Sequence, residues 1–308
     1  MVLDCHQHIL SGYDAYLLMW DGRSRLELHH EGRAIPSEQI AAELDLKELA
    51  FALYFCPGLH PSDPPILKEI AAHVPSFCFV QRHPEQGVDE RHFRGVITFS
   101  SDAPHSDLLV AGGWYDPAVF YKDRKSEEFV LCVARIYQEK NQLELVRDYR
   151  ERIYERYKLP LYLVGGTEDI EYFRKVHAYV DHESVFCTAD PADPAARQSW
   201  RSAQEIAGLC NRARLFVMPS PRETFCIALV EALACGATGV VNGEFMGFEP
   251  HDLGPRVFGN ISGKNGGILE VVEQALEQEI RIDASEWVQK FSLPEIRAKY
   301  MSFIGSRL

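Results

Sequence analysis

The second half of the chain alternates between short apolar runs and longer helical patterns, and this alternation constrains the fold most strongly. Five apolar runs have the length and composition of buried strands: FVLCVARI (129–136), LPLYLVGG (159–166), a run near SVFCTAD, LFVMPS and ATGVVN. Stretches with helical spacing separate them, and LPEIRAKYMSFIGSRL follows as an amphipathic terminal helix. Strands that alternate with helices are typical of a parallel sheet with helices on its faces. The second half is therefore predicted to be an α/β domain.

The first half predicts a smaller α/β unit. Its expected strands are VLDCH at the start of the chain and the segments at about 48–55, 76–81, 94–101 and 107–113. YLLMWDGRSRLELHH is interpreted as a hairpin around Asp21 and Gly22, because Asp-Gly between apolar runs is a turn signal. The rest of the segment 9–40 stays ambiguous.

The join between the two halves is placed near YDPAVFYKDRKSEE, which is charged and has little periodicity. This gives an N-terminal domain at 1–122 and a C-terminal domain at 123–308. The last helix, about 293–308, is expected to pack back onto the N-terminal domain.

Charge and cysteine content narrow the class of protein. The chain has 308 residues and a formal net charge of −13, which argues against nucleic acid or an anionic membrane surface as a partner bound through bulk charge. None of the eight cysteines forms a CxxC pair, and several lie in apolar runs, which favours reduced thiols and a reducing cytoplasm. No signal peptide or apolar run of transmembrane length is visible. We expect a cytoplasmic protein with no transmembrane segment.

Two glutamates stand eight residues apart in PSPRETFCIALVEALACGATGVV. Glu223 is expected in a loop and Glu231 in the helix that follows. The helix would begin at Phe225, Cys226 and Ile227, where unpaired backbone N–H groups and the helix dipole favour a phosphate. On spacing alone, a loop glutamate and a solvated helix glutamate are the favoured interpretation.

Two cations follow the first strand of the second half, in VARIYQEKN. Arg135 and Lys140 lie where the carboxyl edge of a parallel sheet opens into its ligand crevice. Their charges suit a diphosphate, although an ordinary solvated Arg and Lys at the start of a helix would give the same pattern.

Taken together and in this order, the clusters resemble the retaining glycosyltransferases of family 4. In that family a strand ending in "GR" is followed by "xxxKg", "xxGxG" and "PSxxEgfGxxxxEAxAxGxPVV". This chain supplies VARIYQEKN, LYLVGG and MPSPRETFCIALVEALACGATGVV, and AGGWYDPAVFY is similar to the family's "NGvDxxxF". The resemblance covers about 107–300. It implies the GT-B fold, two Rossmann-like domains facing across a cleft, here with an abbreviated N-terminal domain.

The resemblance also implies roles for the charged residues. Glu231 would bind the nucleotide ribose. Glu223 would touch hydroxyls of the donor sugar beside the reacting carbon. Arg135 and Lys140 would hold the diphosphate and stabilise the leaving group.

The same resemblance assigns the backbone amides of Phe225, Cys226 and Ile227 to the phosphate or sugar, and places the base near Thr188. Two departures are visible. Thr224 and Cys226 stand near positions where the family usually has glycines, and GATGV lacks the proline of "GxPVV".

The first domain matches less well. His83 stands where the family often has a histidine that contacts the donor sugar, and a surface histidine in a loop is an equal alternative. His6, His8 and Gly12 follow the first expected strand, so they are candidates for the acceptor side of the cleft.

The implied function is a retaining hexosyl transfer from a nucleotide diphosphate sugar, UDP in preference to GDP, to an acceptor hydroxyl. The acceptor is an unidentified glycan, lipid-linked molecule or small molecule. No metal and no cofactor are expected, because the cations replace a metal.

Three rivals stay open. They are a sugar-nucleotide epimerase of the same fold, a non-catalytic relative that only binds, and a metal-dependent amidohydrolase. The last is suggested by the pair His6 and His8, because two imidazoles one residue apart point the same way on a strand. It would need later histidines at strand ends, and none follows a clear strand.

Overall fold

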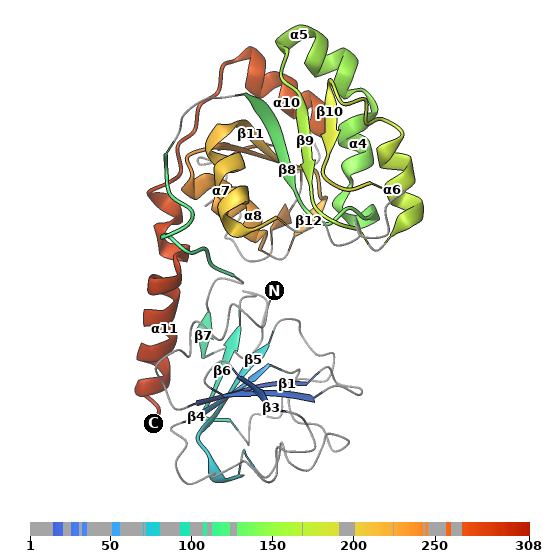
Figure 1. Ribbon diagram of the computed structural model, residues 1–308. Helices are drawn as coiled ribbons and strands as arrows, with labels where there is room; N and C mark the ends of the chain where they lie inside the picture. The colour runs from blue at the N-terminus through green and yellow to red at the C-terminus, as the bar shows by residue number, and fades with distance from the viewer. Residues whose placement is uncertain are drawn as a thin grey trace. The chain divides into compact units, whose positions relative to one another are not determined.

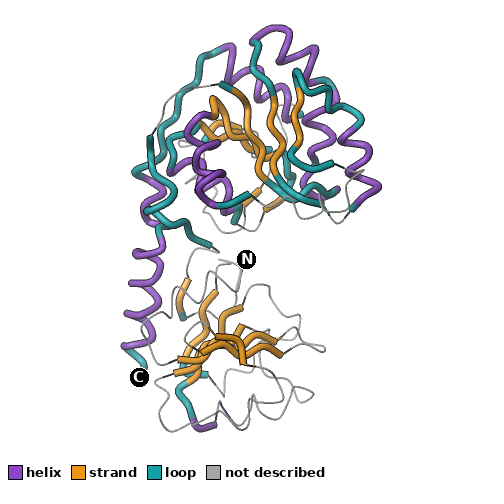
Figure 2. Tube along the Cα trace, in the orientation of Figure 1, coloured by secondary structure: helices purple, strands orange, loops and turns teal. Residues whose placement is uncertain are grey.

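The computed structural model describes part of the chain: residues 15–20, 26–30, 33–35, 51–55, 70, 72–80, 93–98, 107–109, 113–123, 128–167, 169–190, 201–223, 225–242, 244–245, 257–259 and 267–308. The chain divides into two compact units (Figures 1 and 2). One unit is Met1–Trp114 with Leu293–Leu308, and the other is Tyr115–Ser292. The first boundary falls before Tyr115, whereas the sequence placed it after Lys122.

The second unit is built on a six-stranded parallel sheet. Its strands are β8 (Phe129–Val133), β9 (Leu161–Val164), β10 (Val185–Cys187), β11 (Ala213–Met218), β13 (Thr238–Val241) and β15 (Phe258–Gly259). They lie in the order β10-β9-β8-β11-β13-β15, and every neighbouring pair is parallel. Numbered along the chain, this is the 3-2-1-4-5-6 order of doubly wound nucleotide-binding folds. All five strands expected from the sequence are present, and the two-residue β15 is an addition.

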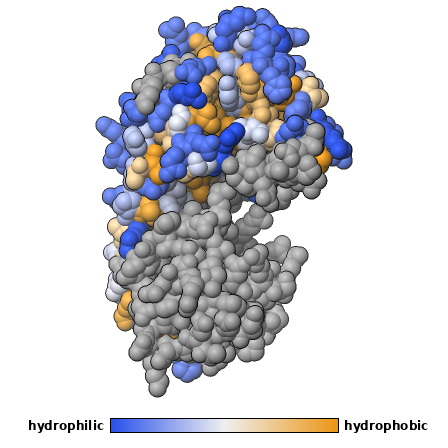
Figure 3. Space-filling view, in the orientation of Figure 1, coloured by the Kyte–Doolittle hydropathy of each residue, from blue (hydrophilic) through white to orange (hydrophobic). Residues whose placement is uncertain are grey.

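One face of this sheet is covered by α4 (Gln142–Arg147), η3 (Arg150–Tyr154), α5 (Glu155–Tyr157), α6 (Ile170–His177) and α10 (Ile268–Glu277). Their apolar residues form one buried cluster with alternate residues of β8, β9 and β11. The helices α7 (Ala203–Arg212) and α8 (Ile227–Ala234) follow β10 and β11 (Figure 1). In the space-filling view, apolar residues gather over the middle of this unit, between polar outer helices (Figure 3).

Gly239, in the GATGV sequence, lies where the packing leaves no room for a side chain. A Cβ there would lie 2.8 Å from the Leu229 side chain and 3.0 Å from that of Val257. The missing Cβ therefore lets α8 approach β13 closely.

The first unit contains a seven-stranded sheet in the order β3-β2-β1-β4-β5-β6-β7. The strands are β1 (Ala15–Trp20), β2 (Leu26–His30), β3 (Arg33–Ile35), β4 (Phe51–Phe55), β5 (Ser76–Val80), β6 (Gly95–Thr98) and β7 (Leu108–Leu109). β1 pairs antiparallel with β2, as the expected hairpin requires, and parallel with β4. The parallel order then continues from β4 to β7. The expected strand VLDCH lies outside the described residues.

The terminal helix α11 (Leu293–Gly305) belongs to this first unit. The Phe303 ring meets Phe77 edge-on at 5.9 Å, and Arg307 pairs with Asp107 at 2.8 Å. Gly95 permits this packing, because a Cβ on it would lie 2.6 Å from the Phe303 ring.

The second unit begins and ends at one place. The Tyr115 N–H donates to the Phe291 carbonyl at 3.1 Å, and Tyr115 forms a β-bridge with Ser292.

Candidate functional site

The strand order reverses between β8 and β11, and this reversal defines where a ligand can bind. Connections leave these neighbouring strands in opposite directions, so a crevice opens at their carboxyl ends. The segment after β8 runs from Ala134 to Asn141, and the segment after β11 leads into β12 (Arg222–Glu223). The sequence-predicted charged residues Arg135, Lys140 and Glu223 all fall in these two segments.

Lys140 and Glu223 form a direct ion pair across the reversal point, from the ammonium Nζ to the carboxylate Oε1. Lys140 ends the short helix η2 (Gln138–Lys140), and Glu223 ends β12. The two side chains are 19% and 8% exposed. A pair this buried is held in one geometry more firmly than a solvated surface pair.

Glu223 is held by a second small sheet. β12 pairs in parallel with β14 (Glu244–Phe245), which brings Glu223 opposite Phe245. The backbone that carries the carboxylate is therefore held by strand pairing.

Arg135 and Lys140 share an aromatic neighbour. The Arg135 guanidinium lies 5.2 Å and the Lys140 ammonium 6.0 Å from the centre of the Tyr137 ring. Arg135 is exposed, so its charge faces solvent. The structure thus gathers two cations at the carboxyl end of β8, with one of them already paired to a carboxylate.

Backbone contacts hold the loop that carries Arg135. The Gln142 side-chain amide donates to the Arg135 carbonyl at 2.8 Å. Ile136 is held twice: its N–H donates to the Gly166 carbonyl at 2.8 Å, and its carbonyl accepts from the Thr167 hydroxyl at 2.6 Å. The position of the Arg135 backbone is therefore set by groups on α4 and in the loop that follows β9.

Cys226 caps the start of α8 with a left-handed backbone, φ 60° and ψ 76°. A residue with a side chain rarely adopts this conformation, which explains why the family pattern has glycines nearby. Burial raises the pKa of the Cys226 thiol, so the thiol is neutral. Phe225 is buried and its ring meets Phe291 edge-on at 5.4 Å, and Ile227 is the first residue of α8.

Glu231 lies one turn into α8 and is partly buried. Burial raises the pKa of its carboxyl group to about 8. The carboxyl group is therefore largely protonated at neutral pH in the unliganded chain.

This protonation gives a pH-dependent stability. From about pH 4.5 to 8 the unfolded chain loses the Glu231 proton while the folded chain keeps it, so the free energy of unfolding falls as the pH rises. We expect a slope of up to about 1.4 kcal/mol per pH unit, absent in Glu231→Gln. Urea unfolding of both proteins at pH 5, 6.5 and 8 measures it. The exposed Glu171→Gln should keep the wild-type slope, and a wild-type slope in Glu231→Gln would contradict the assignment.

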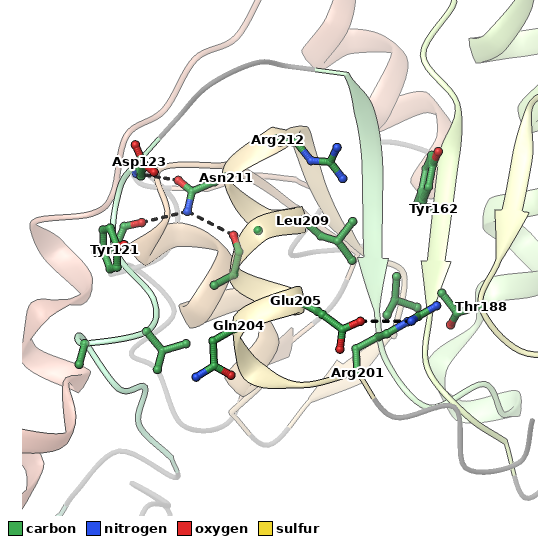
Figure 4. Close-up of a pocket in the computed structure, with 15 residues that line it drawn as sticks. Tyr121, Asp123, Tyr162, Thr188, Arg201, Gln204, Glu205, Leu209, Asn211 and Arg212 are labelled. Atoms are coloured by element: carbon green, nitrogen blue, oxygen red, sulfur yellow. Dashed lines mark hydrogen bonds and ion pairs between the residues drawn. The ribbon is translucent and has the colours of Figure 1, made fainter.

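Thr188 follows β10, and its hydroxyl accepts a hydrogen bond from the Gly165 N–H at 3.2 Å. It also lines a cavity of about 640 Å³ in the second unit. In Figure 4, α7 lies in the middle of the lining residues, with Tyr162 and Thr188 on one side of it and Tyr121 and Asp123 on the other. Among the sequence-predicted site residues that the structure describes, Thr188 alone lines this cavity, and neither Lys140 nor Glu223 does.

Several sequence-predicted residues cannot be placed, because His6, His8, Gly12, His83 and Thr224 lie outside the described residues. Within the described ranges, no group of three or more His, Cys, Asp or Glu side chains is arranged to hold a metal ion. Among the helices described, none has the length and apolar character needed to cross a membrane.

The sequence did not single out Tyr137, Asn141, Gln142 or Glu144, although all four support the charged residues. Asn141 carried a usable signal. It follows Lys140 at the position where the family pattern has a glycine, and asparagine is the residue that best replaces glycine in a left-handed turn. The structure shows this turn, with φ 57° and ψ 27° at Asn141.

Residues 127–243 match the family model described as glycosyl transferases group 1, which is less than half of the chain. No curated protein matches the sequence. The match contains the whole of the charged site, from Arg135 to Glu231.

Solved glycosyltransferase structures share the fold. A sucrose-phosphate synthase from Thermosynechococcus elongatus is 14% identical with a TM-score of 0.61, over 93% of this chain and 86% of that one. The pneumococcal O-GlcNAc transferase GtfA, in complex with UDP and GlcNAc, is 13% identical with a TM-score of 0.59, over 94% of this chain and 64% of that one. The GtfA/B complex is 13% identical with a TM-score of 0.58, over 93% of this chain and 64% of that one. This chain thus spans less than two thirds of the last two. The similarities confirm the α/β, GT-B fold.

Proposed function

We propose that the chain is a retaining glycosyltransferase of family 4 that moves a hexose from a nucleotide diphosphate sugar to an acceptor hydroxyl, without a metal ion. The observation that carries the proposal is the Lys140–Glu223 pair at the strand-order reversal, inside the segment that matches group 1 glycosyltransferases. Arg135 beside the same aromatic ring supplies a second cation.

Donor binding is expected to rearrange this ion pair. The diphosphate carries more negative charge than one carboxylate, so it competes for the Lys140 ammonium. Arg135 and the backbone amides at the start of α8, those of Phe225, Cys226 and Ile227, would bind the same phosphates. The Glu223 carboxylate, released from Lys140, then accepts hydrogen bonds from hydroxyls of the donor sugar.

In the reaction, the bond between the anomeric carbon and the phosphate oxygen breaks, and its electron pair leaves with the nucleoside diphosphate. The acceptor oxygen forms its bond to the anomeric carbon on the same face. The acceptor proton passes to the departing phosphate oxygen. Lys140 and Arg135 stabilise the negative charge that grows on that phosphate, which is electrostatic stabilisation of the transition state.

The remaining assignments are part of the same proposal. Glu231 binds the ribose, Thr188 lies near the base, and His83 contacts the donor sugar. The nucleotide is UDP, which the similar O-GlcNAc transferase structure contains. His6, His8 and Gly12 lie on the side of the acceptor, a glycan, lipid-linked molecule or small molecule. The described cysteines are all free, which suits a reducing cytoplasm.

Nucleoside diphosphate release from UDP- and GDP-sugars, measured with and without candidate acceptors, tests the reaction. We expect release that depends on the acceptor, persists in EDTA and gives a product with the donor's anomeric configuration. Conversion of the donor sugar without an acceptor would indicate an epimerase. Binding with no release or conversion would indicate a non-catalytic relative.

UDP should stabilise the chain against heat. At 100 times its Kd, a ligand that binds only the folded state adds about 2.7 kcal/mol to the free energy of unfolding. Differential scanning fluorimetry with UDP, GDP and ADP measures the shift in Tm. The expected order is UDP above GDP, and the shift should be lost in Lys140→Met/Arg135→Met. Equal shifts in that variant would contradict a phosphate site at these cations.

A further inference from the structure

Asn141 joins the two loops that carry the Lys140–Glu223 pair. It follows Lys140 directly, ends η2 and begins α4 in a left-handed backbone conformation. Its side-chain amide donates to a Glu144 carboxylate oxygen and, at 3.4 Å, to the Pro219 carbonyl. Pro219 follows β11, so this amide spans from the β8 loop to the β11 loop.

Glu144 anchors this amide to a third element. Its other carboxylate oxygen accepts from the Ile268 N–H at 3.1 Å, at the first residue of α10. Gly267 precedes that residue, and a Cβ on it would lie 2.7 Å from the same oxygen. The carboxylate therefore occupies the N-terminus of α10, where the helix dipole favours a negative charge.

The Pro219 carbonyl also accepts a hydrogen bond from the segment that follows β13. The Asn242 side chain donates to it at 3.3 Å, and the Asn242 N–H donates to the Met218 carbonyl at 3.2 Å. Asn242 follows β13 and precedes β14, the partner of the strand that carries Glu223. The loops on both sides of the ion pair are thus tied to one carbonyl.

We propose that Glu144 and Asn141 are positioning residues for Lys140, and that they set the place of its ammonium group between Glu223 and the donor phosphates. The expected effect on turnover rests on the proposed function. The expected effect on the Lys140–Glu223 ion pair does not. Lysine carries a point charge on a flexible stem, so its ammonium has a fixed place only where both its backbone and its carboxylate partner are held. A displacement of about 1 Å can cost on the order of 10²-fold in rate.

The first test needs no substrate. A double-mutant cycle with Lys140→Met and Glu223→Gln, measured by urea unfolding, gives the coupling between the pair. If Glu144 sets the place of Lys140, the coupling should fall to less than half in a Glu144→Ala background. Glu144→Gln keeps the shape but only one of the two acceptor oxygens, so its coupling should lie between those of the wild type and Glu144→Ala. An undiminished coupling in Glu144→Ala would overturn the proposal.

Asn141 gives a matched pair of variants. Asn141→Gly keeps the left-handed backbone and removes the amide, so it should lower the coupling as Glu144→Ala does. An unchanged coupling in Asn141→Gly would remove Asn141 from the proposal.

The second test uses turnover of the donor identified by nucleotide release. Glu144→Ala should lower kcat about 10- to 100-fold with a smaller change in donor KM. In a Lys140→Met background the same substitution should cause no further loss, because Glu144 acts through Lys140. Equal losses in both backgrounds would overturn this step. If wild-type protein turns over no donor, the proposed function fails, and the coupling test still decides the positioning role.

Asp181 provides the structural control. Its carboxylate accepts hydrogen bonds from the N–H groups of Glu183, Ser184 and Val185. This turn leads into β10, an edge strand of the same sheet. Asp181→Ala should lower Tm while leaving kcat and the Lys140–Glu223 coupling unchanged. A loss of coupling in Asp181→Ala would show that general destabilisation explains the effect of Glu144→Ala.

Discussion

Replacement of Lys140 by methionine is expected to lower kcat for sugar transfer by about 10²–10³-fold. Methionine keeps the length and apolar stem of lysine but removes the charge that we propose stabilises the leaving phosphate. The loss should fall mainly on kcat, because the charge on the phosphate grows in the transition state. Steady-state kinetics with the preferred donor measures the change.

A loss of stability must be separated from this effect. Lys140→Met leaves the mostly buried Glu223 carboxylate without its cation, which destabilises the folded chain. Adding Glu223→Gln removes the unpaired charge and should restore Tm without restoring kcat. Lys175 is an exposed lysine on α6 that pairs with Glu171. Lys175→Met should change Tm and kcat only slightly. A full-rate Lys140→Met enzyme would refute the proposed mechanism.

Gly165→Ala is expected to destabilise the chain by about 3–5 kcal/mol. Gly165 has φ +151°, and a Cβ there would lie 2.0 Å from the Ala134 carbonyl oxygen. Backbone cannot move aside as the end of a flexible side chain can. The substitution therefore forces apart the loops that leave β8 and β9, and it should also displace Arg135. Urea unfolding at pH 7 measures the stability loss.

Gly208→Ala is the matched control. Gly208 lies inside α7, and a Cβ on it would have nothing within 4 Å. Alanine in a helix interior is favoured over glycine by about 0.5–1 kcal/mol, so this variant should be slightly more stable than wild type. Two Gly→Ala substitutions in one sheet-and-helix unit are thus expected to act in opposite directions. A loss of less than about 1 kcal/mol in Gly165→Ala would contradict the close approach of the two loops.

The strands of the second unit could be predicted because buried parallel strands are continuous apolar runs. β15 was missed because two residues carry too little pattern. The spacing of NQLELVRDYRERIYERY, which begins at Asn141, predicts one helical stretch, and the structure divides it into α4, η3 and α5. No glycine or proline marks that division, so no local feature indicates where the helix is interrupted.

The contacts between the predicted site residues could not be read from the sequence. The motif spacing identified Lys140 and Glu223 separately, while their direct pairing depends on how two loops 83 residues apart close on one another. Glu144 was not predictable, because a glutamate on a helix surface is common and its partner Ile268 is 124 residues away. Asn141 carried a local signal only through its left-handed turn.

The β-bridge between Tyr115 and Ser292 has a consequence for how the chain could be assembled and divided. A segment whose two ends meet is an inserted domain, and such segments tolerate excision and circular permutation well. A gene fragment encoding 115–292 is therefore expected to yield a folded product. In genetic terms, the coding segment for the unit with the charged site could be moved and expressed separately from the rest of the gene.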